Sequence, residues 1–275
     1  MRPGEHGCCR FPEMADRERT AVAFMLSALG RNDKIVCYSD RDDLQPLVSR
    51  LQGLDACIRP AMARGQFEVR RADEAFLPDG RFEPERMVAM IREAHDGAVE
   101  NGYSGLSLAA EAPVALCELA GLDLAPYEAR LDGERRRLVA GSYSLLCEYD
   151  YARFGPGVLS GVVDAHDVDA SPELAAIGRT GDLAAARDRR SDALRLAGEL
   201  DFASAEAVLE VLDAHFHGPL RLDLADLTYV DVAGLRALRR SGQPLTITAI
   251  SDAVRRLLAL LAWDTDPAIE VLEPV

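Results

Sequence analysis

The chain has 275 residues, of which 48% are hydrophobic and 28% are charged, a composition typical of folded proteins that argues against disorder over most of its length. Its formal net charge is −15, so we expect no general attraction to nucleic-acid phosphates or to anionic lipid. No stretch reaches the roughly 18 apolar residues of a membrane helix, and no apolar signal core follows the first residues. The sequence therefore predicts a cytoplasmic protein that uses neither nucleic acid nor membrane as a partner.

Helical and strand patterns alternate along the first 165 residues, which is typical of an α/β sheet. We expect an N-terminal loop followed, in chain order, by a helix over 17–29, a strand over 34–38, a helix over 40–51, a strand over 67–70, a helix over 84–101, a strand over 106–110, a helix over 127–139, a strand over 143–149 and a short helix over 155–164.

Residues 181–192 contain few large apolar side chains, so we predict a linker there, with a domain boundary near residue 185. The length fits two domains, one over 1–180 and one over 193–275. In the second we expect a strand over 193–196, a helix over 204–216, a strand over 220–224, a helix over 232–240, a strand over 244–250, a helix over 252–261 and a strand over 269–272.

Six cysteines occur without any C-x-x-C spacing: Cys8, Cys9, Cys37, Cys57, Cys117 and Cys147. That spacing fits neither a disulfide scaffold nor a structural zinc site. We therefore expect reduced, mostly buried thiols.

Three segments of the second half follow one another in a specific order. They are LAGELD at 196–201, LDLADLTYVDVAGL at 222–235 and SDAVRRLL at 251–258. In order and spacing they resemble the STAS domain of anti-sigma-factor antagonists. The resemblance implies a small α/β domain that binds an anti-sigma factor or a switch-protein kinase.

The expected partner-binding face of this domain lies where strand meets helix, at Asp231, Val232, Ala233, Gly234 and Leu235. Asp231 precedes a helix start and can cap its free N–H groups, and Gly234 allows close backbone approach. In the STAS family a Ser or Thr just before this Gly is phosphorylated, whereas this chain has Ala233, which cannot accept phosphate. Binding is then constitutive or controlled elsewhere. In the alternative interpretation, Asp231 only caps and Gly234 only packs.

Separated pieces of the first half resemble the MEDS family, sensory domains first named from methanogens and methylotrophs. The resemblance covers residues 5–170 and rests on His6, NDKIVCY at 32–38, FEPERM at 82–87, the stretch 102–111, YEARL at 127–131, LCEYD at 146–150, and His166. It implies a RecA-like three-layer sheet domain that has lost its phosphate loop. No G-x-x-x-x-G-K-[ST] string occurs in the chain, so we expect neither ATP hydrolysis nor any catalytic residue.

Strand ends of open α/β sheets meet at one crevice, and six chemically distinctive residues fall at or near predicted strand ends: His6, Tyr38, Glu111, Cys147, Tyr149 and His166. Such a pocket could bind a small organic ligand, or a metal or haem. In the alternative interpretation, Tyr38 and Cys147 are core residues and both histidines lie in surface loops. The family usually has a Pro where this chain has Asp167.

These features together favour a non-enzymatic signalling protein without an assigned cofactor, in which a sensor of a small signal is coupled to a STAS adaptor that regulates transcription. A second hypothesis is a nucleotide binder or enzyme with Glu111 as base. A third is a redox or haem sensor that uses a histidine with Cys8, Cys9 or Cys147. Arg135–Arg137 are expected on a solvated helix face.

Overall fold

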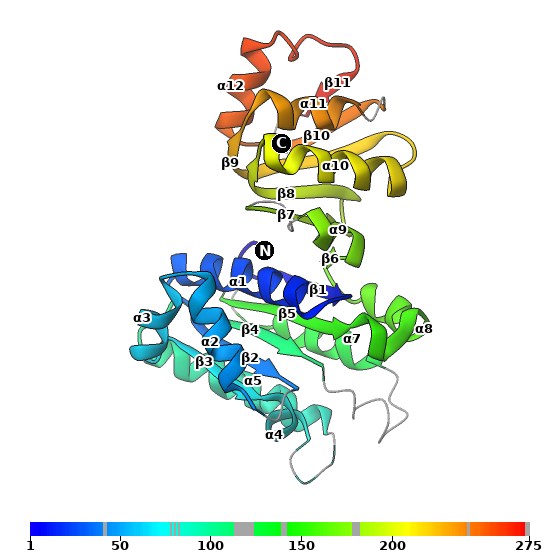
Figure 1. Cartoon of the computed structure of the whole chain (residues 1–275). Coiled ribbons are helices and arrows are strands. Elements are labelled where there is room, and N and C mark those ends of the chain that lie inside the picture. Colours follow the sequence, from blue (N-terminus) through cyan, green and yellow to red (C-terminus); the bar gives the residue numbers. More distant parts are fainter. Residues whose placement is uncertain are drawn as a thin grey trace. The chain divides into compact units, whose positions relative to one another are not determined.

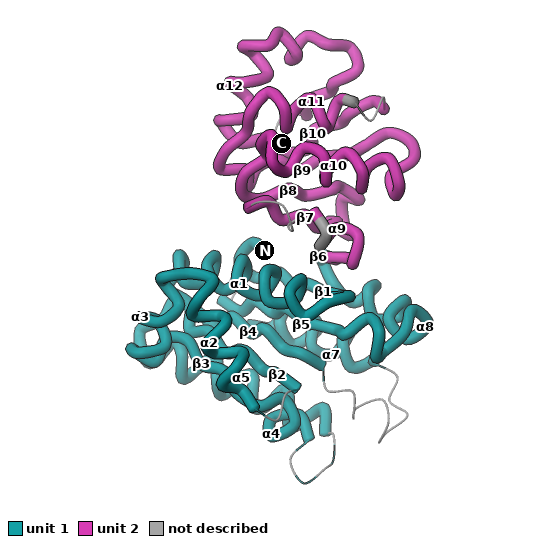
Figure 2. The backbone as a smooth tube through the Cα atoms, viewed as in Figure 1, with its two compact units in different colours: residues 1–168 teal, residues 169–275 magenta. Residues whose placement is uncertain are grey.

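The computed structural model describes residues 1–40, 43–77, 79, 81, 83–112, 124–138, 142–177, 182–240 and 243–272. The chain divides into two compact units, Met1–Val168 and Asp169–Val275, coloured teal and magenta in Figure 2. Both units are α/β, which confirms the predicted fold class. None of the helices in the described ranges has the length and apolar character needed to cross a membrane.

The first unit is built on a parallel sheet with the strand order β1-β5-β4-β2-β3 (Figure 1). Nearly every residue of β4 and β5 is buried, as expected of parallel strands that helices cover on both faces. The strand bounds are β1 His6–Phe11, β2 Lys34–Ser39, β3 Phe67–Arg71, β4 Leu106–Glu111 and β5 Tyr143–Asp150.

Helices pack on both faces of this sheet (Figure 1). One face is covered by α1, which contacts β1, β2, β4 and β5. The other face forms an apolar core with α4, α5, α7 and α8. The helix bounds are α1 Met14–Gly30, α2 Gln45–Leu54, α3 Ile58–Ala63, α4 Ala72–Phe76, α5 Pro84–Glu100, α7 Leu124–Arg135 and α8 Tyr151–Val163.

Strand β1 corrects the expected N-terminal loop. Its sequence, HGCCRF, has none of the β-branched residues that mark strands. It is nevertheless almost wholly buried and pairs in parallel with β5, so tertiary pairing outweighs local propensity here. Cys8 and Cys9 lie on β1, Cys37 on β2 and Cys147 on β5; all four are buried and none forms a disulfide within the described residues. Cys57 is exposed, and Cys117 lies outside the described residues.

The second unit contains five strands in the order β11-β10-β9-β8-β7, of which β8 to β11 pair in parallel and β7 pairs antiparallel to β8. Asp201 and Ser204 form a capping box at the start of α10. The bounds are α9 Pro172–Ile177, β7 Leu183–Asp188, β8 Ala193–Leu200, α10 Phe202–His215, β9 Leu220–Val230, α11 Val232–Arg240, β10 Leu245–Ile250, α12 Asp252–Leu260 and β11 Ile269–Val271. Strand β6, Val168–Ala170, spans the boundary between the units.

The stretch predicted as a linker, 181–192, is therefore not one. Its central residues form β7, whose three alanines gave little hydrophobic signal. They need no large side chains, because the pairing with β8 supplies the backbone hydrogen bonds. The units divide between 168 and 169, and not near 185.

Candidate functional site

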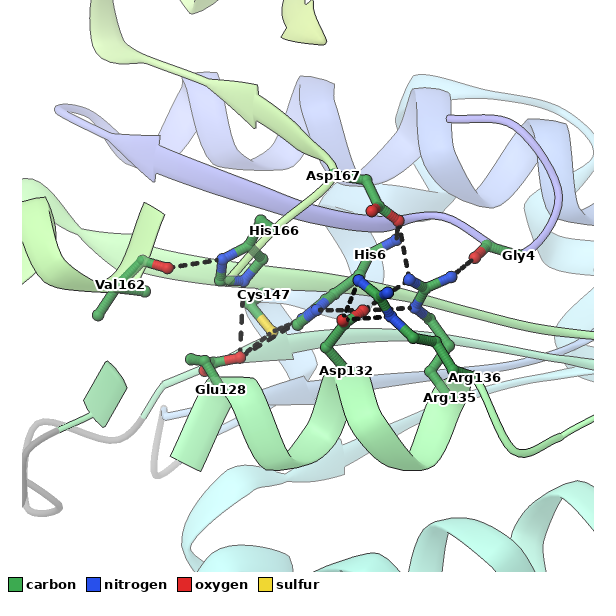
Figure 3. Close-up of polar contacts among 10 residues, drawn as sticks. All are labelled: Gly4, His6, Glu128, Asp132, Arg135, Arg136, Cys147, Val162, His166 and Asp167. Atoms are coloured by element: carbon green, nitrogen blue, oxygen red, sulfur yellow. Dashed lines mark hydrogen bonds and ion pairs between the residues drawn. The ribbon is translucent and has the colours of Figure 1, made fainter. Parts of the chain in front are cut away.

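Four buried side chains from separate segments of the first unit meet in one cluster: His6, Glu128, Cys147 and His166 (Figure 3). His6 is the first residue of β1, Cys147 lies on β5 and Glu128 lies on α7. His166 follows the end of α8. One potential ligand atom from each residue lies within 4.8 Å of the other three. We call these four residues the tetrad.

Glu128 is the centre of the tetrad. Its Oε2 lies 3.4 Å from His6 Nε2, 3.4 Å from Cys147 Sγ and 3.5 Å from His166 Nε2. His6 Nε2 is also 3.3 Å from Cys147 Sγ, and the two imidazole rings lie 4.1 Å apart between centroids. The four groups therefore face one small volume rather than pairing off.

Hydrogen bonds outside the tetrad hold its members in position. The Tyr149 hydroxyl donates to Glu128 Oε1. His166 Nδ1 lies 2.9 Å from the carbonyl oxygen of Val162. Because a carbonyl only accepts, Nδ1 must carry the proton, and Nε2 of neutral His166 then presents a lone pair to the tetrad.

Burial sets the protonation of the tetrad. Burial and repulsion from His6 lower the pKa of His166 to about 4, although Glu128 acts against this. Burial works to raise the pKa of Glu128, but hydrogen bonding with His6, attraction to both imidazoles and the hydrogen bond from Tyr149 lower it. Burial and the Glu128 charge raise the pKa of the Cys147 thiol well above its usual range. At neutral pH an ionised Glu128 thus faces a neutral His166 and a protonated thiol.

Ionic contacts tie the entry of β1 to the tetrad. Asp167 Oδ2 accepts a hydrogen bond from the His6 backbone N–H at 3.2 Å and lies 3.0 Å from Arg135 Nη2. Arg135 also donates to the carbonyl oxygen of Gly4 and to Asp132, whose Oδ1 lies 3.8 Å from His6 Nδ1. The side chain of Arg135 is only 9% exposed, which corrects the expected solvated face for this residue, whereas Arg136 and Arg137 are exposed as predicted. Asp167, a departure from the family pattern, anchors β1 here.

Glu111 lies apart from the tetrad, on the face of the sheet that α1 covers. It pairs in register with Glu148, and neighbouring positions along a strand point to opposite faces, so Glu148 points away from Cys147. Arg17 Nη2 lies 2.8 Å from Glu148 Oε2 and 3.4 Å from Glu111 Oε2, and Ser39 Oγ donates to Glu111 at 2.8 Å. Burial raises the pKa of Glu148 to about 7; the Glu111 charge adds to this and Arg17 acts against it. The predicted placement of Glu111 in one pocket with the histidines is therefore wrong.

Of the six residues predicted for a pocket, four gather: His6, Cys147 and His166 in the tetrad and Tyr149 beside it. Tyr38 instead packs in the core, edge-on to Phe76 with ring centroids 5.5 Å apart. The interpretation of the histidines as surface loop residues is wrong, since His6 is 0% exposed and His166 3%.

Glu128 was missed because it lies on a helix rather than at a strand end. A signal for it exists in the sequence. Glu128 shares the buried stripe of α7 with Leu124, Tyr127 and Leu131, the i, i+3, i+4, i+7 spacing of a core-facing helix. A carboxylate in that stripe is unusual, because burying an unpaired charge is costly.

The space beside the tetrad is small. A cavity of about 20 Å³ touches Glu128, Cys147 and Tyr149 and is otherwise lined mostly by apolar side chains, which is room for about one water molecule. A larger hollow of about 500 Å³ lies between α5 and α7, and none of the predicted residues lines it. The tetrad therefore fits an ion far better than an organic ligand.

In the second unit, some residues of the predicted partner-binding face make contacts within the unit and are not available to a partner. Asp231 Oδ1 accepts from the Gly234 N–H at 2.8 Å, and its Oδ2 accepts from the Phe202 N–H at 3.0 Å. A Cβ at Gly234 would lie 2.4 Å from a backbone oxygen of β8, so glycine is required there. Gly234 and Leu235 are buried, whereas Val232 and Ala233 are partly exposed. Asp231 thus caps, as the alternative interpretation held, and the side chains at 232 and 233 are the ones presented to solvent.

Comparison with known proteins agrees with the division of the chain into two units. A family model described as the MEthanogen/methylotroph, DcmR Sensory domain (MEDS) matches residues 5–167, and one described as Mlab, STAS domain matches residues 183–273. The crystal structure of flagellar accessory protein FlaH from Methanocaldococcus jannaschii is similar at 7% identity over 62% of this chain and 72% of that chain, with a TM-score of 0.43, too distant for any inference. No curated protein matches. The two family matches confirm a MEDS domain followed by a STAS domain, in the predicted order.

Proposed function

Since this chain belongs to the MEDS family of sensory domains and carries a STAS domain at residues 183–273, we propose that it is a non-enzymatic regulator of transcription. In this proposal the sensory unit responds to a small signal. The STAS unit binds an anti-sigma factor or a switch-protein kinase through the start of α11. The observation that carries the proposal is the partly exposed pair Val232 and Ala233 at that helix start, where a phosphorylatable hydroxyl is lacking.

The connection between β1 and α1 supports a non-enzymatic first unit. Only Pro12 and Glu13 separate the two elements, whereas a phosphate loop needs a glycine-rich stretch whose N–H groups and lysine hold the phosphates. Pro12 has no N–H, and the Glu13 carboxylate would repel a phosphate. The chain's one lysine, Lys34, starts β2 and pairs with Glu68.

The hydroxyls near the helix start do not replace the missing switch residue. Ser204 is 0% exposed, and its hydroxyl is used in the capping box of α10. The exposed Thr228 donates its hydroxyl to the Gly198 carbonyl at 3.0 Å, while Ser241 lies outside the described residues. Binding without phosphorylation of this face is therefore the mode we propose.

The test measures binding of the purified full chain to each anti-sigma factor and switch-protein kinase of its source organism by calorimetry. Ala233→Arg places a charged side chain on the proposed face, and we expect at least about tenfold weaker binding, which is a loss of about 1.4 kcal/mol. The matched control is Ala259→Arg at an exposed position of α12, which should bind like wild type.

Two outcomes oppose the proposal. If none of those proteins binds, the partner class is wrong. If both arginine variants bind like wild type, the assigned face is wrong. The same kinases should transfer no phosphate to the wild-type chain, while Ala233→Ser should become a substrate. If the wild-type chain is phosphorylated and this phosphate controls binding, then binding is not constitutive and another residue is the switch.

A further inference from the structure

We propose that the tetrad of His6, Glu128, Cys147 and His166 binds one divalent transition-metal ion, with Zn²⁺ as the best fit. This deepens the proposed function, because it names the ligand class of the sensory unit. It rests on contacts within that unit alone, so it can fail or succeed separately from partner binding.

The distances match a tetrahedral shell. Zinc binds thiolate at about 2.3 Å and imidazole or carboxylate at about 2.0–2.2 Å, which places neighbouring ligand atoms about 3.3–3.8 Å apart. Four of the six ligand-to-ligand edges of the tetrad measure 3.3, 3.4, 3.4 and 3.5 Å. The ligand atoms thus already surround a point of the right size for the ion.

A cation also resolves an unfavourable contact. His166 Nε2 makes no hydrogen bond and is buried. With its proton on Nδ1, it directs a lone pair at Glu128 Oε2, 3.5 Å away. Two electron-rich atoms facing each other in a buried site need a positive centre between them. A metal ion bound by both atoms supplies it.

The donor set selects the class of ion. One thiolate, two imidazoles and one carboxylate suit zinc and its neighbours in the first transition row, and not the oxygen-preferring Mg²⁺ or Ca²⁺. When Zn²⁺ binds, the Cys147 S–H bond breaks and its proton leaves to solvent. The ion, the thiolate and the Glu128 carboxylate then sum to zero charge, which is favourable in a buried site.

The surroundings contain the outer contacts that metal ligands usually have. The Nδ1–H of His166 is held by a backbone carbonyl, and Glu128 Oε1 by the Tyr149 hydroxyl. Four protein ligands leave no open position for a substrate, so the site is suited to sensing or stability rather than to hydrolysis.

The experiment uses the full chain, dialysed against a chelator and then titrated with Zn²⁺ in competition with a chromophoric chelator. Co²⁺ is added separately as a spectroscopic probe. We expect one ion per chain, and a Co²⁺ spectrum with the tetrahedral bands and the thiolate charge-transfer band. Cys147→Ser should remove the thiolate band. Glu128→Gln and His166→Gln should each weaken Zn²⁺ binding by at least about 100-fold, more than loss of an outer contact.

Matched controls separate the tetrad from other buried groups. Cys8→Ser changes the buried cysteine in register with Cys147 on the adjacent strand, and His95→Gln changes a buried histidine that contacts Ser142. Both should keep the affinity and the Co²⁺ spectrum. If a ligand variant fails to fold, Tyr149→Phe serves as a milder test, and we expect it to weaken Zn²⁺ binding 10- to 100-fold.

Absence of stoichiometric Zn²⁺ or Co²⁺ binding, or a thiolate band that survives Cys147→Ser, would overturn the metal site. Neither result would bear on the α11 face, whose test uses Ala233 variants and a protein partner. Conversely, a chain that binds zinc but none of the candidate partners keeps the metal site and loses the proposed output.

Discussion

The two faces of the first unit's sheet bury carboxylates in opposite ways. On the face covered by α1, Glu111 and Glu148 share a cation that the chain itself supplies, the guanidinium of Arg17. On the other face, Glu128 is surrounded by two imidazoles and a thiol, with no arginine or lysine in direct contact among the described contacts. Adjacent residues of β5, Cys147 and Glu148, belong to these different environments.

The difference shows that the charge of buried carboxylates can be offset by the chain itself on one face of a sheet and only by a bound cation on the other. The Arg17 guanidinium is part of the chain, so a counter-charge for Glu111 and Glu148 is always present. The tetrad face reaches balance only when a cation arrives. This asymmetry is what a sensory domain needs, because a ligand changes a protein only through the state it binds preferentially.

The largest expected effect comes from removing the internal cation. Arg17→Met leaves Glu111 and Glu148 buried without a counter-charge, and breaking such a buried pair costs about 3–5 kcal/mol. Urea unfolding followed by far-ultraviolet circular dichroism should show the first unit destabilised. Trp263, the sole tryptophan, lies in the second unit, so its fluorescence transition should not move. Arg130→Met, which breaks the exposed pair of Arg130 on α7 with Glu85 on α5, should cost less than about 1 kcal/mol.

In metal-free protein, the contributions of the two faces to folding stability should change with pH in opposite directions. The folded pKa of Glu148, about 7, lies above its usual value of 4.5, so its contribution to stability is full below pH 4.5 and is lost as pH rises through 7. The folded pKa of His166, about 4, lies below its usual value of 6.5, so its contribution is full above pH 6.5 and is lost as pH falls through 4. Each amounts to about 3 kcal/mol at most.

Unfolding midpoints measured between pH 4.5 and 7.5 check this opposition. The stability of Glu148→Gln relative to wild type should rise with pH, and that of His166→Gln should fall. Parallel slopes for the two variants would contradict the contrast between the faces.

Zinc should stabilise one face only. At a free Zn²⁺ concentration 100 times the dissociation constant, the first unit should gain about 2.7 kcal/mol. Glu128→Gln should abolish this gain, whereas Glu111→Gln on the opposite face should retain it. Equal gains in all three proteins would place the ion elsewhere. The measurement is the shift of the urea midpoint with and without chelator.

The smallest expected effect compares two tyrosines on the same face of β5. Tyr149→Phe removes a hydrogen bond to the ionised Glu128 and should cost about 2 kcal/mol. The hydroxyl of Tyr143 has no hydrogen-bond partner in the described part of the chain, so Tyr143→Phe should change the unfolding free energy by less than about 0.5 kcal/mol. Equal losses would show that the Tyr149 contact contributes nothing particular.

The sequence predicts most strands of the sheet and three of the four residues of the tetrad. Hydrophobic periodicity locates β2, β4 and β5, because these strands are built from large apolar residues. It misses β1 and β7, whose cysteines, glycine and alanines carry little strand propensity and depend on pairing with neighbours.

The strand-end rule grouped His6, Cys147 and His166, and these residues do lie together. They do not meet at the carboxyl ends of the strands, however, because His6 begins β1 and Cys147 lies within β5. The same rule failed for Glu111, because it says which edge of the sheet a residue reaches and not which face. The register of β4 with β5 decides the face, and a single sequence does not reveal register. Glu128 required a different signal, a charge within a helix's buried stripe.

The boundary between the units lies only two residues beyond His166. His166 and Asp167 are both held to the first unit by side-chain contacts, and strand β6 begins at the next residue, Val168. The backbone that leaves the first unit therefore passes directly beside the tetrad. A shift of the His166 imidazole would reach the start of β6 across one intervening residue, Asp167, so the main chain itself is a short route out of the sensory unit.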